Sequence, residues 1–455
     1  MSEHLNAALG YAQEHQAEFL TRLKELVAFG SISTSEEHQG EIEKTAQWIA
    51  ERLKILGMER VMIMPTAGHP VVYAEHIGAP GKPTILIYGH YDVQPVDPLD
   101  LWETDPFSAT VKGENLYARG TSDMKGQVMA CLNAVESVMQ TGKLPVNVKF
   151  FIEGEEEIGS PSLPAWIDEN KDLLKADFCL NPDAGMLGKE HPTITYALRG
   201  LASFELTVSG PNHDLHSGVY GGTVHNPAKA LTDLLAGMHD ENNLISLPGF
   251  YDSVRPLSND ERLQLAKLPV GDGFIKQQTG VPETWGEAGY TSVERAGGRP
   301  TLEINGMISG FTGSGQKTII PARAMAKITC RLVPDQNPED VYQQMKQYLE
   351  TNAPKSIHWE LKMYGGSRAS ISDIQKPWVT ALAQAMETVW GTAPLFKREG
   401  GSVPVVGMMQ SALAMESVLT GFGLPDDNLH APNEKMHLPT WYKGTKALIR
   451  FFFNL

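Results

Sequence analysis

Apolar residues near the start of the chain recur at the spacing of helices. Between positions 5 and 27 they return at intervals close to 3.6 residues, which predicts a helix with one buried face. Residues 41–56 repeat this pattern. Short apolar runs bounded by Gly and Pro then predict strands at 60–64, 71–76 and 84–88. The chain therefore begins with helices and continues into a sheet.

Helices and strands go on alternating in the next part of the chain. We expect a helix over 126–140, where the apolar residues have helical spacing, and strands at 146–152 and 177–180, where the runs are largely apolar. Strands that alternate with helices in this way are typical of a mostly parallel sheet with helices on both faces. The sequence thus predicts an α/β fold.

The pattern changes near residue 199. Strands with one exposed face are now expected from apolar-polar alternation, and the segment 241–300 is polar, irregular and rich in Pro and Gly. The elements predicted in this region are a strand at 201–209, helices at 226–239 and 338–351, a turn and strand over 319–333, and one short helix near 259–268.

This change predicts a second domain inserted into the first. We expect the α/β domain to comprise residues 1–198 and 372–455, with its last helices at 378–389 and 440–453. Residues 199–371 would form an inserted α+β domain. At roughly 170 residues, the insertion is large enough to be a full domain.

Composition and charge exclude several functions. A chain of 455 residues is long enough for more than one core. Its net charge of -16, without a block of Lys or Arg, would repel nucleic acids and anionic membrane surfaces. The three cysteines are widely spaced in apolar surroundings, which favours buried free thiols over disulfides or a metal site. No apolar run resembles a signal peptide or a membrane span, so we expect a cytoplasmic protein.

Potential metal ligands follow the predicted strands. His90 and Asp92 come after the strand at 84–88, two residues apart, so in an extended chain they point the same way and a carboxylate could orient the imidazole. By itself, a His-x-Asp pair is common and usually has no function. Asp123 precedes a predicted helix, where an N-cap is the simpler interpretation.

Further carboxylates and a second histidine extend this pattern. The acidic run 153–160 and Asp183 each follow a largely apolar strand, where several carboxylates need cations to remain charged, although an exposed acidic loop would look the same. His430 lies near the C-terminus. Taken together, these imidazole and carboxylate groups suit zinc, manganese or cobalt, and two such ions can clamp both partners of a hydrolysis reaction.

Five segments of the chain resemble the co-catalytic metallopeptidases, the family of aminoacylase, acetylornithine deacetylase and succinyl-diaminopimelate desuccinylase. They occur in the same order and span nearly the whole chain, and they are most similar to the carnosinase and cytosolic non-specific dipeptidase branch. The segments are 89–95, 119–126, 153–160, 214–222 and 430–435.

The resemblance implies a role for each residue of the site. Asp123 would bridge two divalent ions, with Asp92 orienting one imidazole and Glu156 acting as the general base toward the attacking water. Counting back from Gly159 leaves Glu155 without a role. The implied ligands are His90 and Asp183 at one ion, and Glu157 and His430 at the other.

The resemblance also implies that the inserted domain, 199–371, serves as a lid and a dimerisation surface, and it implies substrate contacts. His216 would steady the oxyanion, in the partner subunit of a homodimer, although a surface loop histidine is the simpler interpretation of its sequence. Thr318, Arg331 and Ser402 would contact the substrate, with Arg331 offering paired hydrogen bonds to its carboxylate. An arginine paired with a surface acid is an equally good interpretation. Tyr364 stands where relatives of this branch tend to carry histidine, which puts substrate preference in doubt.

These observations favour a metal-dependent dipeptidase that cleaves an amide bond next to a free carboxylate, with two zinc or manganese ions, or cobalt, in each subunit. The length of the insertion favours the dipeptidase branch over shorter acylase-type relatives. Two alternatives remain: an N-acyl-amino-acid deacylase or carboxypeptidase of the same family, and a catalytically inactive binding protein. The inactive protein would typically have lost Glu156 or a ligand, and every expected position is filled.

Overall fold

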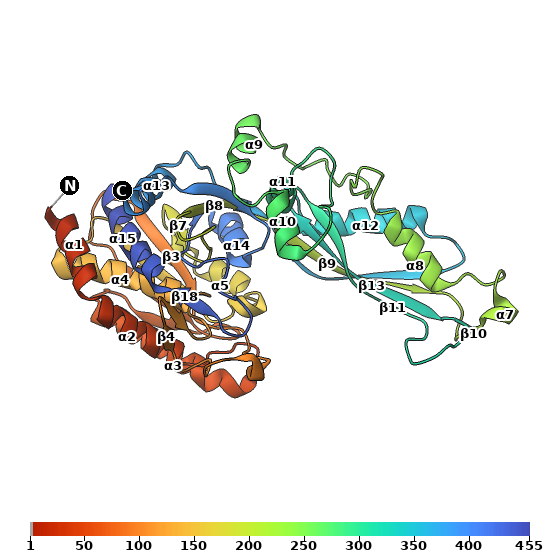
Figure 1. Ribbon diagram of the computed structural model, residues 1–455, viewed down its shortest axis with the longest axis horizontal. Helices are drawn as coiled ribbons and strands as arrows, with labels where there is room; N and C mark the ends of the chain where they lie inside the picture. Colours follow the sequence, from red (N-terminus) through yellow and green to blue (C-terminus); the bar gives the residue numbers. More distant parts are fainter. Residues whose placement is uncertain (1–2) are drawn as a thin grey trace. The chain divides into compact units, whose positions relative to one another are not determined.

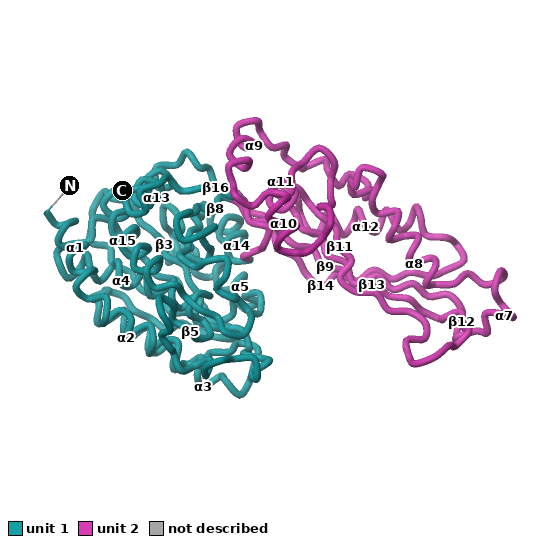
Figure 2. Tube along the Cα trace, in the orientation of Figure 1, with its two compact units in different colours: residues 1–196, 372–397, 404–455 teal, residues 197–371, 398–403 magenta. Residues whose placement is uncertain are grey.

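The computed structural model describes residues 3–455, which form two compact units (Figure 2). Unit 1 comprises residues 1–196, 372–397 and 404–455, and unit 2 comprises 197–371 and 398–403. The apolar pattern predicted boundaries at 199 and 371 but gave no sign of the short return of the chain to unit 2 at 398–403. That return consists of six residues, too few to form a pattern of their own.

Unit 1 is organised around a nine-stranded sheet (Figure 1). Along this sheet the strands follow the order β1-β2-β6-β3-β7-β17-β8-β15, and β16 pairs with β8. The bounds are β1 Met62–Met64, β2 Val71–His76, β3 Thr84–His90, β6 Asn147–Glu153, β7 Phe178–Asn181, β8 Thr193–Leu198, β15 Ser370–Ile371, β16 Leu395–Glu399 and β17 Ser417–Leu419.

The sheet is mixed rather than mostly parallel. Its centre, β6-β3-β7-β17, is parallel, whereas β1, β2 and β8 pair antiparallel with their neighbours. The prediction of a mostly parallel sheet therefore describes only the centre. The loop that joins β1 and β2 spans residues 65–70 and is too short for the crossover that a parallel pair needs, so these two strands form a hairpin.

Helices cover the sheet of unit 1. Helix α4 packs on β3, and α1, α2 and α15 pack on α4, while α5 contacts α14 on the other side of the sheet (Figure 1). The predicted helix at 5–27 is divided in two near His15. The bounds are α1 Glu3–Glu14, α2 Gln16–Val27, α3 Gln39–Ile55, α4 Lys125–Thr141, α5 Leu163–Glu169, α6 Lys171–Leu174, α13 Pro377–Trp390, α14 Pro404–Leu413 and α15 Leu438–Asn454, with 3-10 turns η1 Glu36–His38, η2 Leu99–Leu101 and η3 Glu156–Ile158.

A small three-stranded sheet in unit 1 joins distant parts of the chain. Its order is β18-β5-β4, with bounds β4 Thr110–Lys112, β5 Asn115–Tyr117 and β18 Lys435–His437. Because β18 pairs with β5, the segment that precedes Lys435 lies beside the segment that follows Tyr117. This pairing brings the C-terminal histidine segment to the loop that precedes α4.

Unit 2 is a two-layer α+β structure. Its four-stranded antiparallel sheet has the order β11-β13-β9-β14, and helices α8 and α12 pack on one face. In β9 every second residue is buried, so one face of the sheet forms the core and the other is open to polar groups. The bounds are β9 Gly200–Ser209, α8 Pro227–Ala236, β11 Thr301–Ser309, β13 Arg323–Leu332, α12 Pro338–Asn352 and β14 His358–Ser367.

The rest of unit 2 lies at the two ends of these long strands (Figure 1). At one end, β10 Leu215–His216 pairs with β12 Ile319–Ile320, and α7 Ser217–Tyr220 follows. At the other lie α10 Asp272–Thr279 and α11 Ser292–Gly298, with α9 Asn259–Leu265 before them. The sequence predicted only the first of these three short helices, because α10 buries no residue and the buried residues of α11 are Glu294, Gly297 and Gly298, so neither has an apolar face.

The expectation for the cysteines is confirmed by the fold. All three cysteines, Cys131, Cys179 and Cys330, are buried and free, and burial raises the pKa of each thiol. Among the helices in residues 3–455, none has both the length and the apolar character needed to cross a membrane.

Candidate metal centre

The candidate site lies at the carboxyl ends of three neighbouring parallel strands. In the order β6-β3-β7, the strands end at Glu153, His90 and Asn181. Parallel strands present their carboxyl ends at the same edge of a sheet, where ligands of α/β proteins usually bind. His90, Glu157 and Asp183 therefore come together although they are far apart in the sequence.

Asp123 lies at the centre of the five predicted ligands. Its Oδ1 is 3.2 Å from Nε2 of His90, and its Oδ2 is 2.9 Å from Nε2 of His430. Each imidazole has a second carboxylate beside it: Asp183 lies 3.9 Å from His90, and Glu157 lies 3.3 Å from His430. The structure thus brings all five side chains together as two imidazole–carboxylate pairs on either side of one aspartate.

The donor set fits divalent cations. Atoms of His90, Asp123 and Glu157 that could bind one ion all lie within 4.8 Å of one another. Burial, reinforced by the neighbouring Asp123 carboxylate, raises the pKa of Glu157 to about 7 and that of Asp183 to about 6. Carboxyl groups crowded in this way retain protons unless cations neutralise them. Imidazole and carboxylate ligands without a thiol suit zinc, manganese or cobalt.

Asp92 orients the parts of the site around it. It is fully buried, and its two carboxylate oxygens accept hydrogen bonds from the backbone N–H groups of Glu156 and Glu157 at 3.3 and 3.1 Å. Nδ1 of His90 lies 3.0 Å from the backbone carbonyl oxygen of Asp92 and 3.4 Å from its carboxylate. These contacts leave Nε2 of His90 directed at Asp123. The closer partner of Nδ1 of His90 is the backbone carbonyl oxygen of Asp92, a contact that the sequence did not suggest.

The acidic run contains side chains in different environments. Glu153 accepts hydrogen bonds from Tyr88 and Ser160, and burial raises its pKa to about 8. Glu155 accepts from the backbone N–H groups of His69 and Ser162, at 3.0 and 3.2 Å. Both carboxylates are thus engaged in holding loops, which agrees with leaving Glu155 out of the predicted site.

Glu156 differs from its neighbours because its carboxylate accepts no hydrogen bond from any described residue (3–455). Burial raises its pKa to about 9, against the opposing effect of His90, and the carboxylates of Asp183, Glu157 and Asp123 add to the rise. A carboxylate with these neighbours and without a partner of its own can exchange a proton with a group bound beside it.

Glu434 is a buried residue of the site that the sequence did not reveal. One of its carboxylate oxygens accepts from the backbone N–H groups of Ser122 and Asp123, at 2.9 and 3.1 Å, and the other from Gly120 N–H and Arg119 at 2.9 and 2.7 Å. Both members of the Arg119–Glu434 ion pair are almost completely buried. Glu434 therefore fixes the backbone that presents Asp123. The signals available in the sequence were its position four residues after His430 and its place in the segment 430–435 that resembles the family.

The predicted substrate-binding residues of unit 2 lie at opposite ends of its sheet. Arg331 donates a 2.9 Å hydrogen bond to Oγ of Ser402. Thr318 instead lies beside His216, because its carbonyl oxygen accepts from Ser217 N–H at 3.0 Å. The two-stranded sheet β10-β12 beside which they lie adjoins the Arg323 end of β13, eight residues from Arg331. At about 3.3 Å per residue, the two pairs are separated by roughly 27 Å.

Comparison with known proteins identifies the family. Residues 86–454 match the model of "Peptidase family M20/M25/M40". This chain belongs to that family. It is 33% identical to the human Beta-Ala-His dipeptidase, over 99% of this chain and 92% of the relative. Its identity to the Cys-Gly metallodipeptidase of Schizosaccharomyces pombe is 32%, over 96% and 95% of the two chains.

Solved structures agree with this assignment. A metallo-carboxypeptidase of the M20 family from Sulfolobus solfataricus matches with a TM-score of 0.85 and 36% identity, covering 96% of this chain and 98% of that one. Human carnosine dipeptidase 1 matches with a TM-score of 0.80 and 33% identity, covering 100% and 99%. The predicted resemblance to the carnosinase and dipeptidase branch is confirmed, and the chain is a metal-dependent peptidase.

Two further residues complete the description of this M20 peptidase. Tyr364, on β14, donates a 2.5 Å hydrogen bond to Glu205 and accepts one from Lys327 at 3.0 Å, so its ring lies against the open face of the unit 2 sheet. His216 is exposed, and its Nδ1 accepts from Gly218 N–H at 3.0 Å. A neutral His216 therefore carries its proton on Nε2, where it can be donated outward.

Proposed function

We propose that this M20 peptidase hydrolyses the amide bond of dipeptides, or of similarly short substrates with a free carboxylate, using two divalent ions in each chain. One observation carries the proposal: each carboxylate oxygen of Asp123 faces a different imidazole, and each imidazole has a further carboxylate beside it. The similarity to a Beta-Ala-His dipeptidase and a Cys-Gly metallodipeptidase supports the choice of dipeptides.

The five ligands divide into two sets that share Asp123. His90 and Asp183 would complete one site, and Glu157 and His430 the other. Bound there, a pair of divalent cations supplies Lewis acidity, which makes a water molecule nucleophilic near neutral pH and polarises the substrate carbonyl. Zinc and manganese suit this mixture of imidazole and carboxylate, and cobalt is a third option.

Glu156 is proposed as the general base. Its carboxylate accepts a proton from the attacking water while the water oxygen adds to the carbonyl carbon of the scissile bond. Glu156 then delivers that proton to the amide nitrogen as the carbon–nitrogen bond breaks, so the products are an amine and a carboxylic acid, which loses its remaining proton to water and becomes a carboxylate. The absence of hydrogen bonds to its carboxylate from residues 3–455 leaves it available for both transfers, and Asp92 holds its backbone in place.

Arg331 is proposed to bind the free carboxylate of the substrate through charge-assisted hydrogen bonds, with Ser402 beside it as the partner of its guanidinium. His216 and Thr318 lie roughly 27 Å away along the same sheet, too far to reach the same dipeptide in the same chain. If both pairs contact one substrate, two copies of the chain must contribute. We therefore propose a homodimer in which His216 of the partner copy donates its Nε2–H to the developing oxyanion.

A second candidate activity has a specific observation in its favour. The relative from Sulfolobus solfataricus, 36% identical over nearly the whole chain, is described as a metallo-carboxypeptidase. Carboxypeptidases also recognise a free carboxylate, so the residues proposed here would serve longer peptides as well. An N-acyl-amino-acid deacylase would require the same groups.

The test uses metal-stripped protein reloaded with Mn²⁺, Zn²⁺ or Co²⁺ and offered dipeptides, tripeptides and N-acyl-amino acids. We expect hydrolysis of dipeptides above all others, only after reloading. Preferred release of the last residue from tripeptides would favour the carboxypeptidase, and hydrolysis of acyl substrates alone would favour the deacylase. No hydrolysis with any metal would favour an inactive binding protein. We also propose a cytoplasmic location, because three buried free cysteines are typical of a reducing compartment.

A further inference from the structure

Arg199 holds the segment that carries Ser402 in place through hydrogen bonds. Its Nε donates a 3.0 Å hydrogen bond to the backbone carbonyl oxygen of Gly400, and its backbone N–H donates to the carbonyl of Glu399 at 3.3 Å. Its own carbonyl oxygen accepts a 2.6 Å hydrogen bond from Oγ of Ser402. The side chain and the backbone of one arginine thus hold three of the four residues from 399 to 402.

These contacts determine how Ser402 meets Arg331. A serine hydroxyl has one proton, and here it is donated to the carbonyl of Arg199. Ser402 can therefore only accept from Arg331, which donates to it at 2.9 Å. A continuous chain of hydrogen bonds runs from the backbone of Arg199 through Ser402 to the guanidinium of Arg331, and this chain fixes the direction in which Arg331 points.

Arg199 also places a second positive charge near Arg331. Within residues 3–455 neither guanidinium lies within ion-pair distance of a carboxylate, although Glu399 and Glu303 offset part of the charge of Arg199 from farther away. Burial, and then the nearby charge of Arg331, lower the pKa of Arg199 to about 10. Two guanidinium groups that form no ion pair with a described residue provide a favourable place for an anion.

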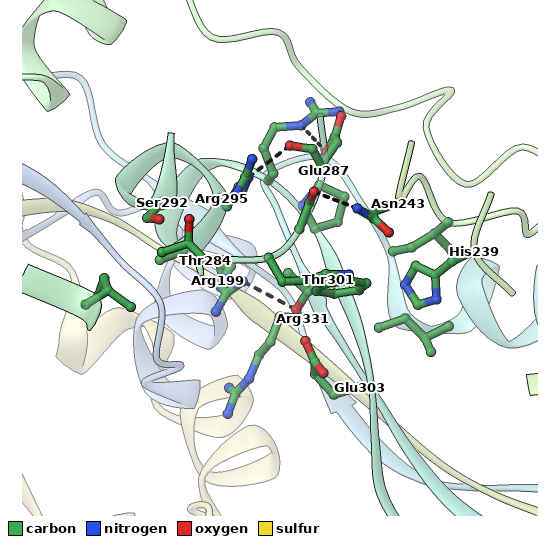
Figure 3. Close-up of a pocket in the computed structure, with 18 of the residues that line it drawn as sticks. Arg199, His239, Asn243, Thr284, Glu287, Ser292, Arg295, Thr301, Glu303 and Arg331 are labelled. Atoms are coloured by element: carbon green, nitrogen blue, oxygen red, sulfur yellow. Dashed lines mark hydrogen bonds and ion pairs between the residues drawn. The ribbon is translucent and has the colours of Figure 1, made fainter. Parts of the chain in front are cut away.

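The two arginines border a cavity of about 590 Å³ in unit 2 (Figure 3). Arg199, Arg331 and Glu303 lie on one side of this cavity, next to Thr301, whose hydroxyl is 3.5 Å from a terminal nitrogen of Arg199. A cavity of this size next to Arg331 leaves space for the group to which the carboxylate is attached.

We propose that Arg199 is a positioning residue for recognition of the substrate carboxylate. It holds residues 399–402 so that Ser402 orients Arg331, and it supplies a second positive charge behind that contact. This inference rests on the proposed function, because it assumes that Arg331 binds the carboxylate. Arg199 acts through Arg331 and Ser402 and need not touch the substrate itself.

The test measures how the metal-loaded enzyme discriminates a dipeptide from its C-terminal amide, which lacks the negative charge. We expect Arg199→Met to raise KM for the acid by about tenfold or more, which corresponds to about 1.4 kcal/mol. The amide should change far less, so the acid-to-amide ratio of kcat/KM falls by a similar factor. Arg199→Lys keeps the charge but loses the planar fork, and should recover part of the ratio.

Arg295 provides a matched control. It borders the same cavity, and its Nε likewise donates to a backbone carbonyl, that of Glu287 at 2.9 Å. Arg295→Met should leave the acid-to-amide ratio unchanged, because among the described residues no hydrogen bond or ion pair joins Arg295 to the segment 399–402. If the acid-to-amide ratio fell equally in the Arg295 variant, the effect would come from the general charge of the cavity, and the assignment to Arg199 would be overturned.

The outcomes separate this inference from the proposed function. If the wild-type enzyme shows no preference for the acid, the proposed carboxylate recognition fails and the inference fails with it. If the wild type prefers the acid and Arg199→Met retains that preference, the inference alone is overturned. Should Arg199→Met fail to fold, as judged by circular dichroism, the Arg199→Lys variant decides: an unchanged ratio refutes a positioning role, and a reduced ratio supports it.

Discussion

Replacing Glu156 by glutamine separates catalysis from metal binding. Glutamine has nearly the same shape as glutamate but cannot accept a proton at neutral pH. Because the Glu156 carboxylate accepts no hydrogen bond from residues 3–455, the substitution breaks no side-chain network, and the backbone contact of residue 156 with Asp92 remains. We therefore expect the Glu156→Gln protein to fold normally and to bind its full complement of divalent ions.

The size of the effect follows from the role proposed for Glu156. General acid–base catalysis by a positioned side chain typically contributes about 10²- to 10⁴-fold, or about 3 to 5 kcal/mol of the activation barrier. We expect kcat to fall by this factor. KM should change little, because the proposed carboxylate contact at Arg331 is untouched.

The assay combines kcat and KM on a dipeptide with elemental analysis of the purified protein. The acidic run itself supplies two controls. Glu155→Gln weakens hydrogen bonds to the N–H groups of His69 and Ser162, so it should lower thermal stability and change kcat by no more than a few-fold. Glu157→Gln should reduce metal content together with activity. Full activity in Glu156→Gln, or loss of its metal, would refute the assignment of the base.

Three further predictions test other parts of the site. In the metal-free folded protein the pKa values of Glu157 and Asp183 are raised to about 7 and about 6, whereas the unfolded chain releases these protons near pH 4 to 5. The folded state therefore holds more protons than the unfolded state between about pH 4 and about pH 7, and its stability should fall as pH rises through that range. Divalent ions should therefore raise Tm more at about pH 8 than at about pH 5.5, and an equal rise would contradict this. Glu434→Gln leaves the buried Arg119 without its counter-charge, so it should lower the free energy of unfolding by about 3 to 5 kcal/mol, measured with denaturant, and weaken metal binding. An unchanged unfolding midpoint would argue against the role of Glu434 in fixing the backbone that presents Asp123. Finally, His216→Ala chains and Glu156→Gln chains can be mixed and allowed to reassociate into dimers. About a quarter of wild-type activity should return, because about half of the dimers are mixed and each mixed dimer holds one intact site. No recovery would mean that His216 acts within its own chain.

The arrangement of the candidate ligands could be predicted largely because it depends on strand ends. His90 and Asp183 each follow an apolar strand, and parallel neighbours in an α/β sheet bring such positions to one edge. The contribution of His430 could not be predicted in the same way. It depends on the pairing of β18 with β5, two three-residue strands whose sequences carry no periodic signal.

Elements of unit 2 were missed for a different physical reason. The edge strands β11 and β14 bury few residues, so their sequences lack the regular alternation that reveals β9. Helices α10 and α11 are short, and α10 has no buried residue. Segments whose conformation depends on contacts with the rest of a domain, rather than on their own apolar pattern, give no local signal to read.

The acidic run shows how far side-chain chemistry alone can be interpreted. Glu153, Glu155, Glu156 and Glu157 are chemically identical, yet two of them hold loops, one lies beside His430, and one accepts no hydrogen bond from residues 3–455. Glu156 and Glu157 are distinguished by the direction in which the 3-10 turn η3 sends each carboxylate, and the backbone of that turn is held by Asp92, 64 residues before Glu156, through the N–H groups of residues 156 and 157. A function assigned to one acid of such a run therefore depends on the residue that fixes the turn as much as on the acid itself.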